Sequence, residues 1–175
     1  MNALMTKMKV LAVDDNRTNL HILQVFLKKL GHDVILAENG EEAVARFQSE
    51  SPDLVLLDIM MPVMDGFEAA RRIKAMTRDR WTPVIFLSAL NRDENLVEGL
   101  DAGADDLLPK PVNPRLLLAK IRAGRRLAAL HYEIERDREE IRHFAAELAV
   151  SNRRLQEVAL MDPLTACPNR RFFTD

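Results

Sequence analysis

The sequence predicts an α/β fold in which a five-stranded parallel sheet is covered by helices on both faces and is followed by a long helix. Two observations carry this prediction. Short apolar runs, each suited to a strand, alternate along the chain with segments in which apolar residues recur at helical spacing. From Asn113 onward the pattern is helical for about 45 residues, which exceeds a normal globular helix and is typical of a coiled coil.

Composition limits the class of protein. The 175 residues are 47% hydrophobic and 30% charged, as in soluble globular proteins, and allow one domain and part of a second. The net charge of -2 gives no reason to expect nucleic acid or a membrane surface as a partner. No apolar run reaches the roughly 18 residues that span a bilayer, and residues 1–8 do not resemble a signal peptide. Because Cys167 is the one cysteine, no internal disulfide can form, and we expect a cytoplasmic protein.

The first two strands and helices are defined by apolar runs and helix caps. An apolar run ends in Asp14 and Asp15, and Asn16 is suited to cap the helix that follows, which Gly31 ends. The expected elements are a strand at 9–13, a helix from Asn16 to Leu30, a strand at 34–37, a turn at Asn39-Gly40 and a helix around 43–47.

The third strand has the clearest signal. Residues 54–57 are continuously apolar, which is typical of a strand buried on both faces, and Asp58 follows at once. Ligands of open α/β sheets bind at the carboxyl ends of the strands, where Asp58 would lie. Pro62 and the pair Asp65-Gly66 predict a loop and a turn beyond it. Taken alone, Asp58 could equally serve only to cap the next element.

The second half of the sheet repeats the alternation. Right-handed crossovers favour the flavodoxin-like strand order 2-1-3-4-5, which brings the carboxyl ends of strands one, three, four and five to a common edge. The expected elements are a helix at 67–76, a strand at 83–87 that ends in Ser88-Ala89, a helix at 93–102, and a strand at 105–108 that ends in Pro109-Lys110-Pro111.

Five polar residues follow these strands: Asp14, Asp15, Asp58, Ser88 and Lys110. Three carboxylates in one pocket repel one another and stay ionised together only beside a cation. A ligand set made of oxygen atoms suits Mg²⁺. A serine after a strand is usually a cap and a lysine between prolines is usually solvated, but the positions of Ser88 and Lys110 at the same edge favour a role in the site.

These residues resemble, in order and spacing, the receiver domain of response regulators. The resemblance covers about residues 7–126. It rests on Val13-Asp14-Asp15, on Asp58 with Met60-Met61-Pro62 and Asp65-Gly66, on Leu87-Ser88-Ala89, on Gly103-Ala104-Asp105-Asp106 and on Lys110-Pro111.

The resemblance implies a phosphotransfer function. Asp58 would be the phosphoacceptor, phosphorylated by a histidine kinase, a phosphotransfer protein or a small phosphodonor. Asp15, Asp58 and the backbone carbonyl of Met60 would bind Mg²⁺ directly, and Asp14 would bind it through a water. The Lys110 ammonium and the Ser88 hydroxyl would contact the phosphoryl oxygens.

One residue departs from the family pattern. Receivers usually carry an aromatic residue on the fifth strand, and Leu107 takes that place here. The family's output surface is formed by the fourth helix, the fifth strand and the fifth helix. We therefore expect phosphorylation to persist, but the usual inward swing of an aromatic ring cannot link it to that surface.

A heptad repeat runs along the long helix. Eight of its ten a and d positions are apolar, and Asp137 and Ser151 are the polar ones. This pattern favours a parallel homodimer, formed through the receiver and the coiled coil, over a helix that packs back on its own domain. The a positions are Leu127, Ile134, Ile141, Leu148 and Leu155, and the d positions are Leu130, Asp137, Phe144, Ser151 and Val158.

The last residues resemble the opening of a GGDEF domain, the diguanylate cyclase module. Ala166 and Cys167 replace the usual Gly-Leu pair of that family. We expect a receiver at 1–126, a coiled-coil linker at 127–160 and a truncated GGDEF domain at 161–175, without the cyclase active site. The matching residues are Asp162, Leu164, Thr165, Asn169, Arg170, Arg171 and an aromatic at Phe172 or Phe173.

Two functions follow from these expectations. In the first, phosphorylation of the receiver controls a C-terminal diguanylate cyclase, and so cyclic di-GMP synthesis, through a dimeric coiled coil. In the second, the chain is a stand-alone receiver and coiled-coil interaction protein without cyclase output. A DNA-binding regulator is disfavoured because the sequence has no compact basic helix-turn-helix and no basic excess.

Overall fold

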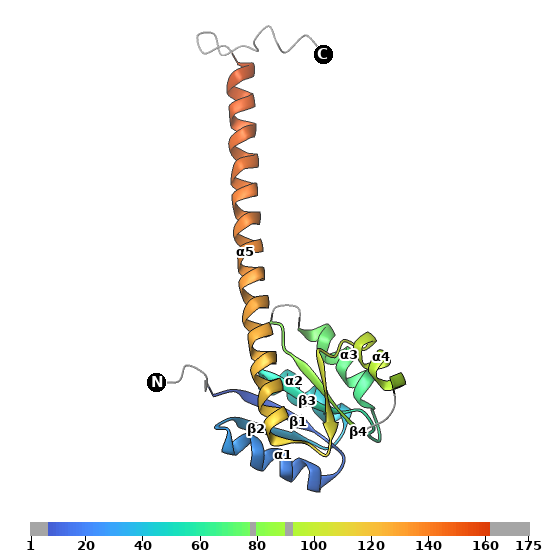
Figure 1. Cartoon of the computed structure of the whole chain (residues 1–175). Coiled ribbons are helices and arrows are strands. Elements are labelled where there is room, and N and C mark those ends of the chain that lie inside the picture. Colours follow the sequence, from blue (N-terminus) through green and yellow to red (C-terminus); the bar gives the residue numbers. More distant parts are fainter. Residues whose placement is uncertain (1–6, 78–79, 90–92, 162–175) are drawn as a thin grey trace. The chain divides into compact units, whose positions relative to one another are not determined.

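The chain folds around a parallel sheet, seen in a computed structural model that describes residues 7–77, 80–89 and 93–161, with the backbone alone at 93–96 (Figure 1). In the described residues the strands lie in the order β2-β1-β3-β4-β5 and all pair in parallel, so the predicted α/β fold and strand order are confirmed. The strands are β1 (Lys9–Val13), β2 (Asp33–Ala37), β3 (Leu54–Asp58), β4 (Val84–Ala89) and β5 (Asp106–Lys110). The helices are α1 (Arg17–Lys29), α2 (Gly40–Glu50), α3 (Gly66–Met76), α4 (Asp93–Asp101) and α5 (Pro114–Leu160).

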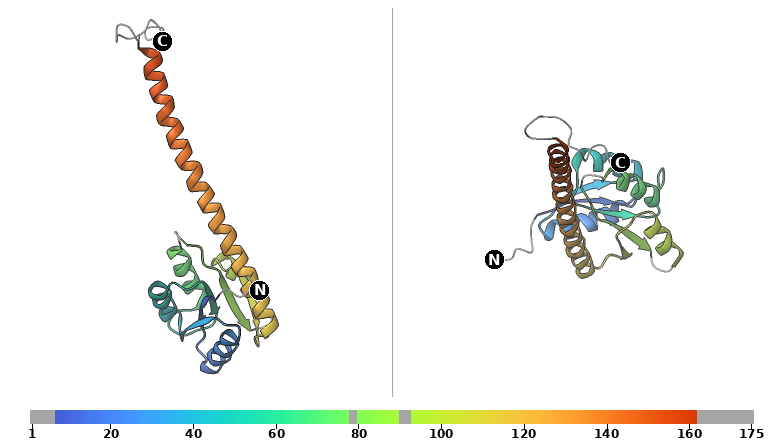
Figure 2. Two further views of the ribbon diagram at one scale, coloured as in Figure 1. Left: turned by 90° about the vertical axis from the view of Figure 1, so that its left-hand side faces the viewer. Right: turned by 90° about the horizontal axis from the view of Figure 1, so that it is seen from above.

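Two apolar cores lie on opposite faces of the sheet, because side chains alternate along each strand. Leu57 of β3 and Phe86 of β4 pack with α2 and α3 on one face. Leu56 and Leu87 pack with α1 and the first turns of α5 on the other. The central strands β1, β3 and β4 are thereby buried on both sides, and the two helix layers can be followed in Figures 1 and 2.

Helices α1, α2 and α3 each begin with a side-chain cap. Asn16 caps α1 as predicted, by accepting hydrogen bonds from the backbone of Thr18 and Asn19. The pairs Asn39-Gly40 and Asp65-Gly66, which we expected to form turns, instead start α2 and α3. The Asn39 and Asp65 side chains are the caps, and each glycine is the first helical residue.

The fourth and fifth strands are longer than predicted and include two of the expected site residues. Ser88 pairs with Pro109, and Ala89 pairs with Lys110, so that each strand extends the other beyond its apolar run. Ser88 and Lys110 are therefore the last residues but one and the last of their strands, rather than residues that follow them. The carboxyl edge of the sheet is still where both lie.

The chain divides into two compact units, Met1–Tyr132 and Glu133–Asp175, and the division falls within α5. In the second unit the apolar heptad residues are exposed: Ile134, Ile141, Phe144, Leu148, Leu155 and Val158. The expected domain limits at 126 and 160, and the coiled coil itself, stay predictions. The residues expected to open a GGDEF domain, from Asp162 onward, lie outside the described residues. None of the described helices is long and apolar enough to cross a membrane.

Candidate functional site

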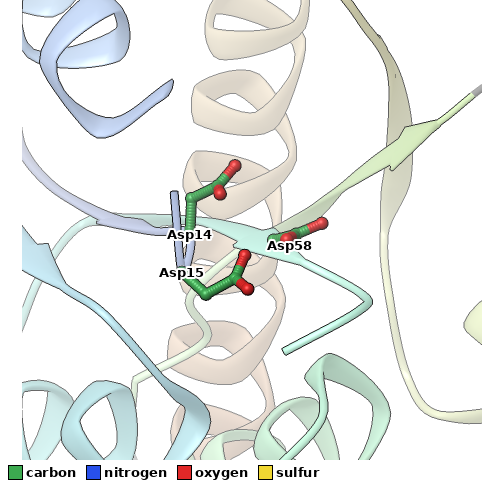
Figure 3. Close-up of side chains that lie close together, drawn as sticks. All are labelled: Asp14, Asp15 and Asp58. Atoms are coloured by element: carbon green, nitrogen blue, oxygen red, sulfur yellow. The ribbon is translucent and has the colours of Figure 1, made fainter. Parts of the chain in front are cut away.

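Three carboxylates meet at the carboxyl edge of the sheet. Because Val13 of β1 pairs with Leu57 of β3, the residues that come next, Asp14 and Asp58, are neighbours. Asp15 joins them, and one carboxylate oxygen of each of the three lies within 4.8 Å of the others (Figure 3). Asp14 is 0% and Asp58 5% exposed, whereas Asp15 is exposed. The predicted cluster is thus present, with two of its members buried.

Lys110 brings a positive charge into the cluster from β5. Its Nζ lies 2.7 Å from Oδ2 of Asp14 and 2.9 Å from Oδ1 of Asp58. The family pattern assigned Lys110 to a phosphoryl oxygen, and here its ammonium is shared by two carboxylates. One cation thus binds two buried anions in the described site.

The pKa values of Asp58 and Lys110 reflect this arrangement. Burial raises the pKa of Asp58, the nearby charges of Asp14 and Asp15 raise it further, and the hydrogen bond and charge of Lys110 oppose both. Burial alone would lower the pKa of Lys110, but the hydrogen bonds to Asp14 and Asp58 and the negative charges of these two carboxylates together raise it. The ammonium therefore stays charged, and the site carries more negative charge than Lys110 neutralises.

Asn19 is a site residue that the sequence did not reveal. Its side-chain amide lies 3.2 Å from Oδ2 and 3.4 Å from Oδ1 of Asp14, and the backbone N–H of Asn16 donates to the same carboxylate at 2.9 Å. These donors orient Asp14 from the first turn of α1. The signal available was a polar residue one helical turn after a capping Asn16, on a face otherwise occupied by Leu20 and Leu23.

Ser88 and Met60 lie at the same edge of the sheet as the carboxylates. Ser88 is half-buried, and its hydroxyl donates to the carbonyl of Ala89 at 3.3 Å. Met60 is two residues beyond Asp58 in the loop from β3 to α3, and its side chain is exposed. Their predicted roles toward a phosphoryl group and a metal ion stay predictions.

The donor set fits a hard divalent cation. Carboxylate oxygens are the ligands that Mg²⁺ prefers, and two of the three carboxylates are anchored on adjacent strands. Burial and mutual repulsion raise the pKa of Asp58, so a cation here would relieve an unfavourable charge. The chemistry of the residues present therefore suits Mg²⁺.

The comparisons with known proteins decide the family. Residues 10–122 match the response regulator receiver domain. The chain belongs to this family. It is 38% identical over 115 residues to the alkaline phosphatase synthesis transcriptional regulatory protein PhoP of Bacillus subtilis, covering 66% of this chain and 47% of that protein. It is 44% identical over 118 residues to a probable transcriptional regulator, ycf27, of Guillardia theta, covering 67% of this chain and 45% of that protein.

Solved receiver structures agree with the fold of this receiver. The chemotaxis protein CheY4 of Vibrio cholerae is 34% identical, with a TM-score of 0.64 over 68% of this chain and 99% of that one. The signal receiver domain of a modulated diguanylate cyclase from Desulfovibrio desulfuricans G20 is 31% identical, with a TM-score of 0.65 over 72% of this chain and 99% of that one. The chain spans about half the length of the curated relatives named above, so these matches identify a two-component receiver and leave its output open.

Proposed function

We propose that Asp58 is the phosphoacceptor of this receiver. The observation that carries the proposal is a buried carboxylate at the end of a central strand, next to two more carboxylates and one ammonium. A carboxylate oxygen of Asp58 attacks the phosphorus of a phosphohistidine or a small phosphodonor. A P–O bond to Asp58 forms; with phosphohistidine the P–N bond breaks and the leaving imidazole takes up a proton, and with an acyl phosphate the donor's P–O bond breaks and a carboxylate leaves.

The other site residues are proposed to bind and orient the reacting groups. Asp15, Asp58 and the Met60 carbonyl would hold Mg²⁺, with Asp14 acting through a water, and the ion would offset charge on the phosphoryl group. Asn19 keeps Asp14 oriented for this role. Lys110 exchanges its contact with Asp58 for one phosphoryl oxygen, and the Ser88 hydroxyl turns from the Ala89 carbonyl to another.

The proposed output is a C-terminal diguanylate cyclase controlled through a homodimeric α5. Support comes from the exposed apolar heptad positions, from the resemblance of residues 159–173 to the opening of a GGDEF domain, and from the structural neighbour that is the receiver of a diguanylate cyclase. The curated relatives are named as transcriptional regulators, but each matches about two thirds of this chain over less than half of its own length. A stand-alone receiver without a cyclase remains the second candidate. We propose that the protein works in the cytoplasm.

Phosphorylation is tested by incubating the chain with Mg²⁺ and acetyl phosphate and measuring its intact mass. We expect the mass of one added phosphoryl group in the wild type and in Asp53→Asn, which removes a carboxylate at the opposite end of β3. We expect none in Asp58→Asn or without Mg²⁺. A phosphoryl group on Asp58→Asn would overturn the assignment of the acceptor.

Assembly is tested by light scattering with Mg²⁺, with and without beryllofluoride, a mimic of the phosphoryl group. Dimers that form only with beryllofluoride, and not in Asp58→Asn, would show that the receiver drives assembly. Dimers under both conditions would show that α5 holds the two copies together, so that phosphorylation acts on the geometry of an existing dimer. A monomer under both conditions would contradict the proposed homodimer.

A further inference from the structure

Helix α5 carries two stripes of side chains in one heptad register. The first stripe packs on the receiver and occupies the b and e positions of the repeat defined above. The second is the a and d stripe that starts at Leu127 and Leu130, and these side chains are exposed. Positions e and a are adjacent on a helix, so within the first compact unit Leu127 lies beside the packed stripe. The packed stripe consists of the buried Leu117, Ile121 and Gly124, the half-buried Ala128, and His131, which stacks on Trp81.

The middle of the packed stripe is a close contact between backbone and strand ends. A Cβ at Gly124 would lie 3.2 Å from Leu54 Cδ1 and 3.4 Å from Pro83 Cβ. The absence of a side chain therefore lets α5 approach the amino ends of β3 and β4. This contact sets the distance of α5 from the sheet.

The last residue of the packed stripe is held by an aromatic stack. The rings of Trp81 and His131 have centroids 4.3 Å apart and planes inclined by 17°. Trp81 lies two residues before Pro83 and is half-buried, whereas His131 is otherwise exposed. His131 lies seven residues beyond Gly124, two helical turns further along α5. The stack thus joins α5 to the receiver one residue before the end of the first compact unit, at Tyr132.

Trp81 is itself anchored to the receiver core through Lys74 of α3. Lys74 Nζ lies 4.8 Å from the centroid of the Trp81 ring, 2.5 Å from Oδ2 of Asp105 and 2.9 Å from the carbonyl oxygen of Thr82. The same Asp105 oxygen accepts the backbone N–H of Val84 at 2.8 Å. The indole position is therefore tied to α3 and to the start of β4.

We propose that the stack of His131 on Trp81 is a positioning contact that sets the rotation of α5 where the helix leaves the receiver, and thereby the direction of its a and d stripe. Each residue turns a helix by about 100°, so even a fraction of one residue's rotation at His131 moves the stripe off the line on which a second copy would meet it. The effect on a second copy rests on the proposed homodimer. The effect on α5 of a single chain does not.

The first test uses one chain and asks whether the stack holds α5. His131→Ala removes the ring, His131→Phe keeps an aromatic ring, and Tyr132→Ala is the matched control because Tyr132 is a neighbouring, exposed ring. Hydrogen exchange is followed at amides 124–134, and the emission of Trp81, the one tryptophan, reports the stack. We expect exchange about tenfold faster in His131→Ala, as loss of an aromatic pair predicts, and near wild-type rates in the other two variants. Equal exchange and emission in His131→Ala and Tyr132→Ala would overturn the proposal.

The second test asks whether the contact directs the seam. In a Cys167→Ser background, a single cysteine is placed at Leu148, an a position, or at Asn152, an e position, and disulfide-linked dimers are measured. We expect strong preference for position 148 in the wild-type and His131→Phe chains, and a preference reduced several-fold in His131→Ala. An unchanged preference in His131→Ala would overturn the role in the seam. Absence of cross-links at both positions in every chain would refute the homodimer, and the exchange result would then decide the positioning role alone.

Discussion

The ammonium group of Lys110 lies 2.9 Å from Oδ1 of Asp58, the carboxylate that we propose as the phosphoacceptor. The same nitrogen lies 2.7 Å from Oδ2 of Asp14, so the two carboxylates share one ammonium group. With Asp15 also in the cluster, three negative charges face one positive charge. The described site therefore holds Asp58 in an unfavourable ionised state, and this has a consequence for stability.

Replacing Asp58 with asparagine is expected to stabilise the fold at neutral pH. Because the pKa of Asp58 is raised in the folded state, ionised Asp58 destabilises the fold, and its penalty develops as pH rises through the folded pKa. Asn removes that charge and keeps the shape, and we expect about 1 kcal/mol more free energy of unfolding at pH 7. The gain should shrink as pH is lowered toward 3.8, the ordinary pKa of an aspartate side chain.

Urea denaturation of Asp58→Asn at several pH values, without divalent cations, measures this effect. Glu41→Gln, which neutralises an exposed carboxylate on α2, is the matched control and should stay within about 0.5 kcal/mol of wild type. An Asp58→Asn protein no more stable than wild type at pH 7 would mean that Lys110 compensates the charge fully.

Val63 is expected to be a source of backbone strain in the loop that follows Asp58. Its φ of 70° is left-handed, a conformation that a β-branched residue rarely adopts, and the Met64 N–H donates to the Pro62 carbonyl across it at 2.8 Å. The Val63 side chain is exposed, so replacing it removes little packing. We expect Val63→Asn to stabilise the protein by about 1 kcal/mol in thermal or urea unfolding. Val63→Ile keeps the branched Cβ and should give no gain, and equal effects of the two substitutions would refute strain as the cause.

His32 is expected to make stability depend on pH in the mildly acidic range. Its pKa is lowered from 6.5, first by burial and then by the charge of Arg125, and its Nδ1 accepts the Met8 N–H at 3.3 Å. The unfolded chain then binds the proton more readily, so stability is complete above pH 6.5 and falls as pH drops toward the folded pKa. The slope is at most about 1.4 kcal/mol per pH unit.

The measurement is the free energy of unfolding of wild type and His32→Gln between pH 5 and 8. The difference between them should change with pH only below about 6.5. His21→Gln, at an exposed position on α1, is the control and should follow the wild-type curve. A His32→Gln curve parallel to that of wild type would exclude His32 as the group responsible.

The parts of this structure that the sequence predicted are those that local patterns determine. The continuous apolar run of β3 requires burial on both faces, and Asn16 caps α1 because its side chain reaches only the adjacent backbone. The convergence of Asp14, Asp15 and Asp58 then follows from the order of the strands. Each of these inferences depends on residues that are neighbours in the sequence or on a general rule of sheet topology. None of them requires knowing how side chains pack.

The features that escaped prediction depend on contacts between distant residues. Ser88 and Lys110 fall inside their strands because pairing between β4 and β5 continues past the apolar runs. The hydrogen bonds from Asn19 to Asp14 depend on the angle at which α1 leaves β1. The stack of Trp81 on His131 joins residues 50 positions apart in the sequence. The residues around each of them give no pattern that predicts this contact. The sequence pattern also predicted a turn at Gly66. In the structure Gly66 is the first residue of α3 and lies against the backbone of Asp58 and Ile59.

Gly66 is expected to be the glycine least tolerant of substitution, because backbone atoms of Asp58 and Ile59 occupy the place where a Cβ would lie. A Cβ there would lie 2.2 Å from the carbonyl oxygen of Asp58 and 2.8 Å from Ile59 Cα, and neither atom can move without distorting the site. We expect Gly66→Ala to cost about 3 kcal/mol in urea unfolding and to slow phosphorylation of Asp58. Gly99→Ala is the matched comparison, since its Cβ would meet side-chain atoms alone, Phe86 at 3.1 Å and Phe67 at 3.8 Å, and alanine is the better helix former. The free energy of unfolding of Gly99→Ala should stay within about 1 kcal/mol of wild type. Equal losses in the two variants would show that the backbone beside Gly66 can move to accept a Cβ.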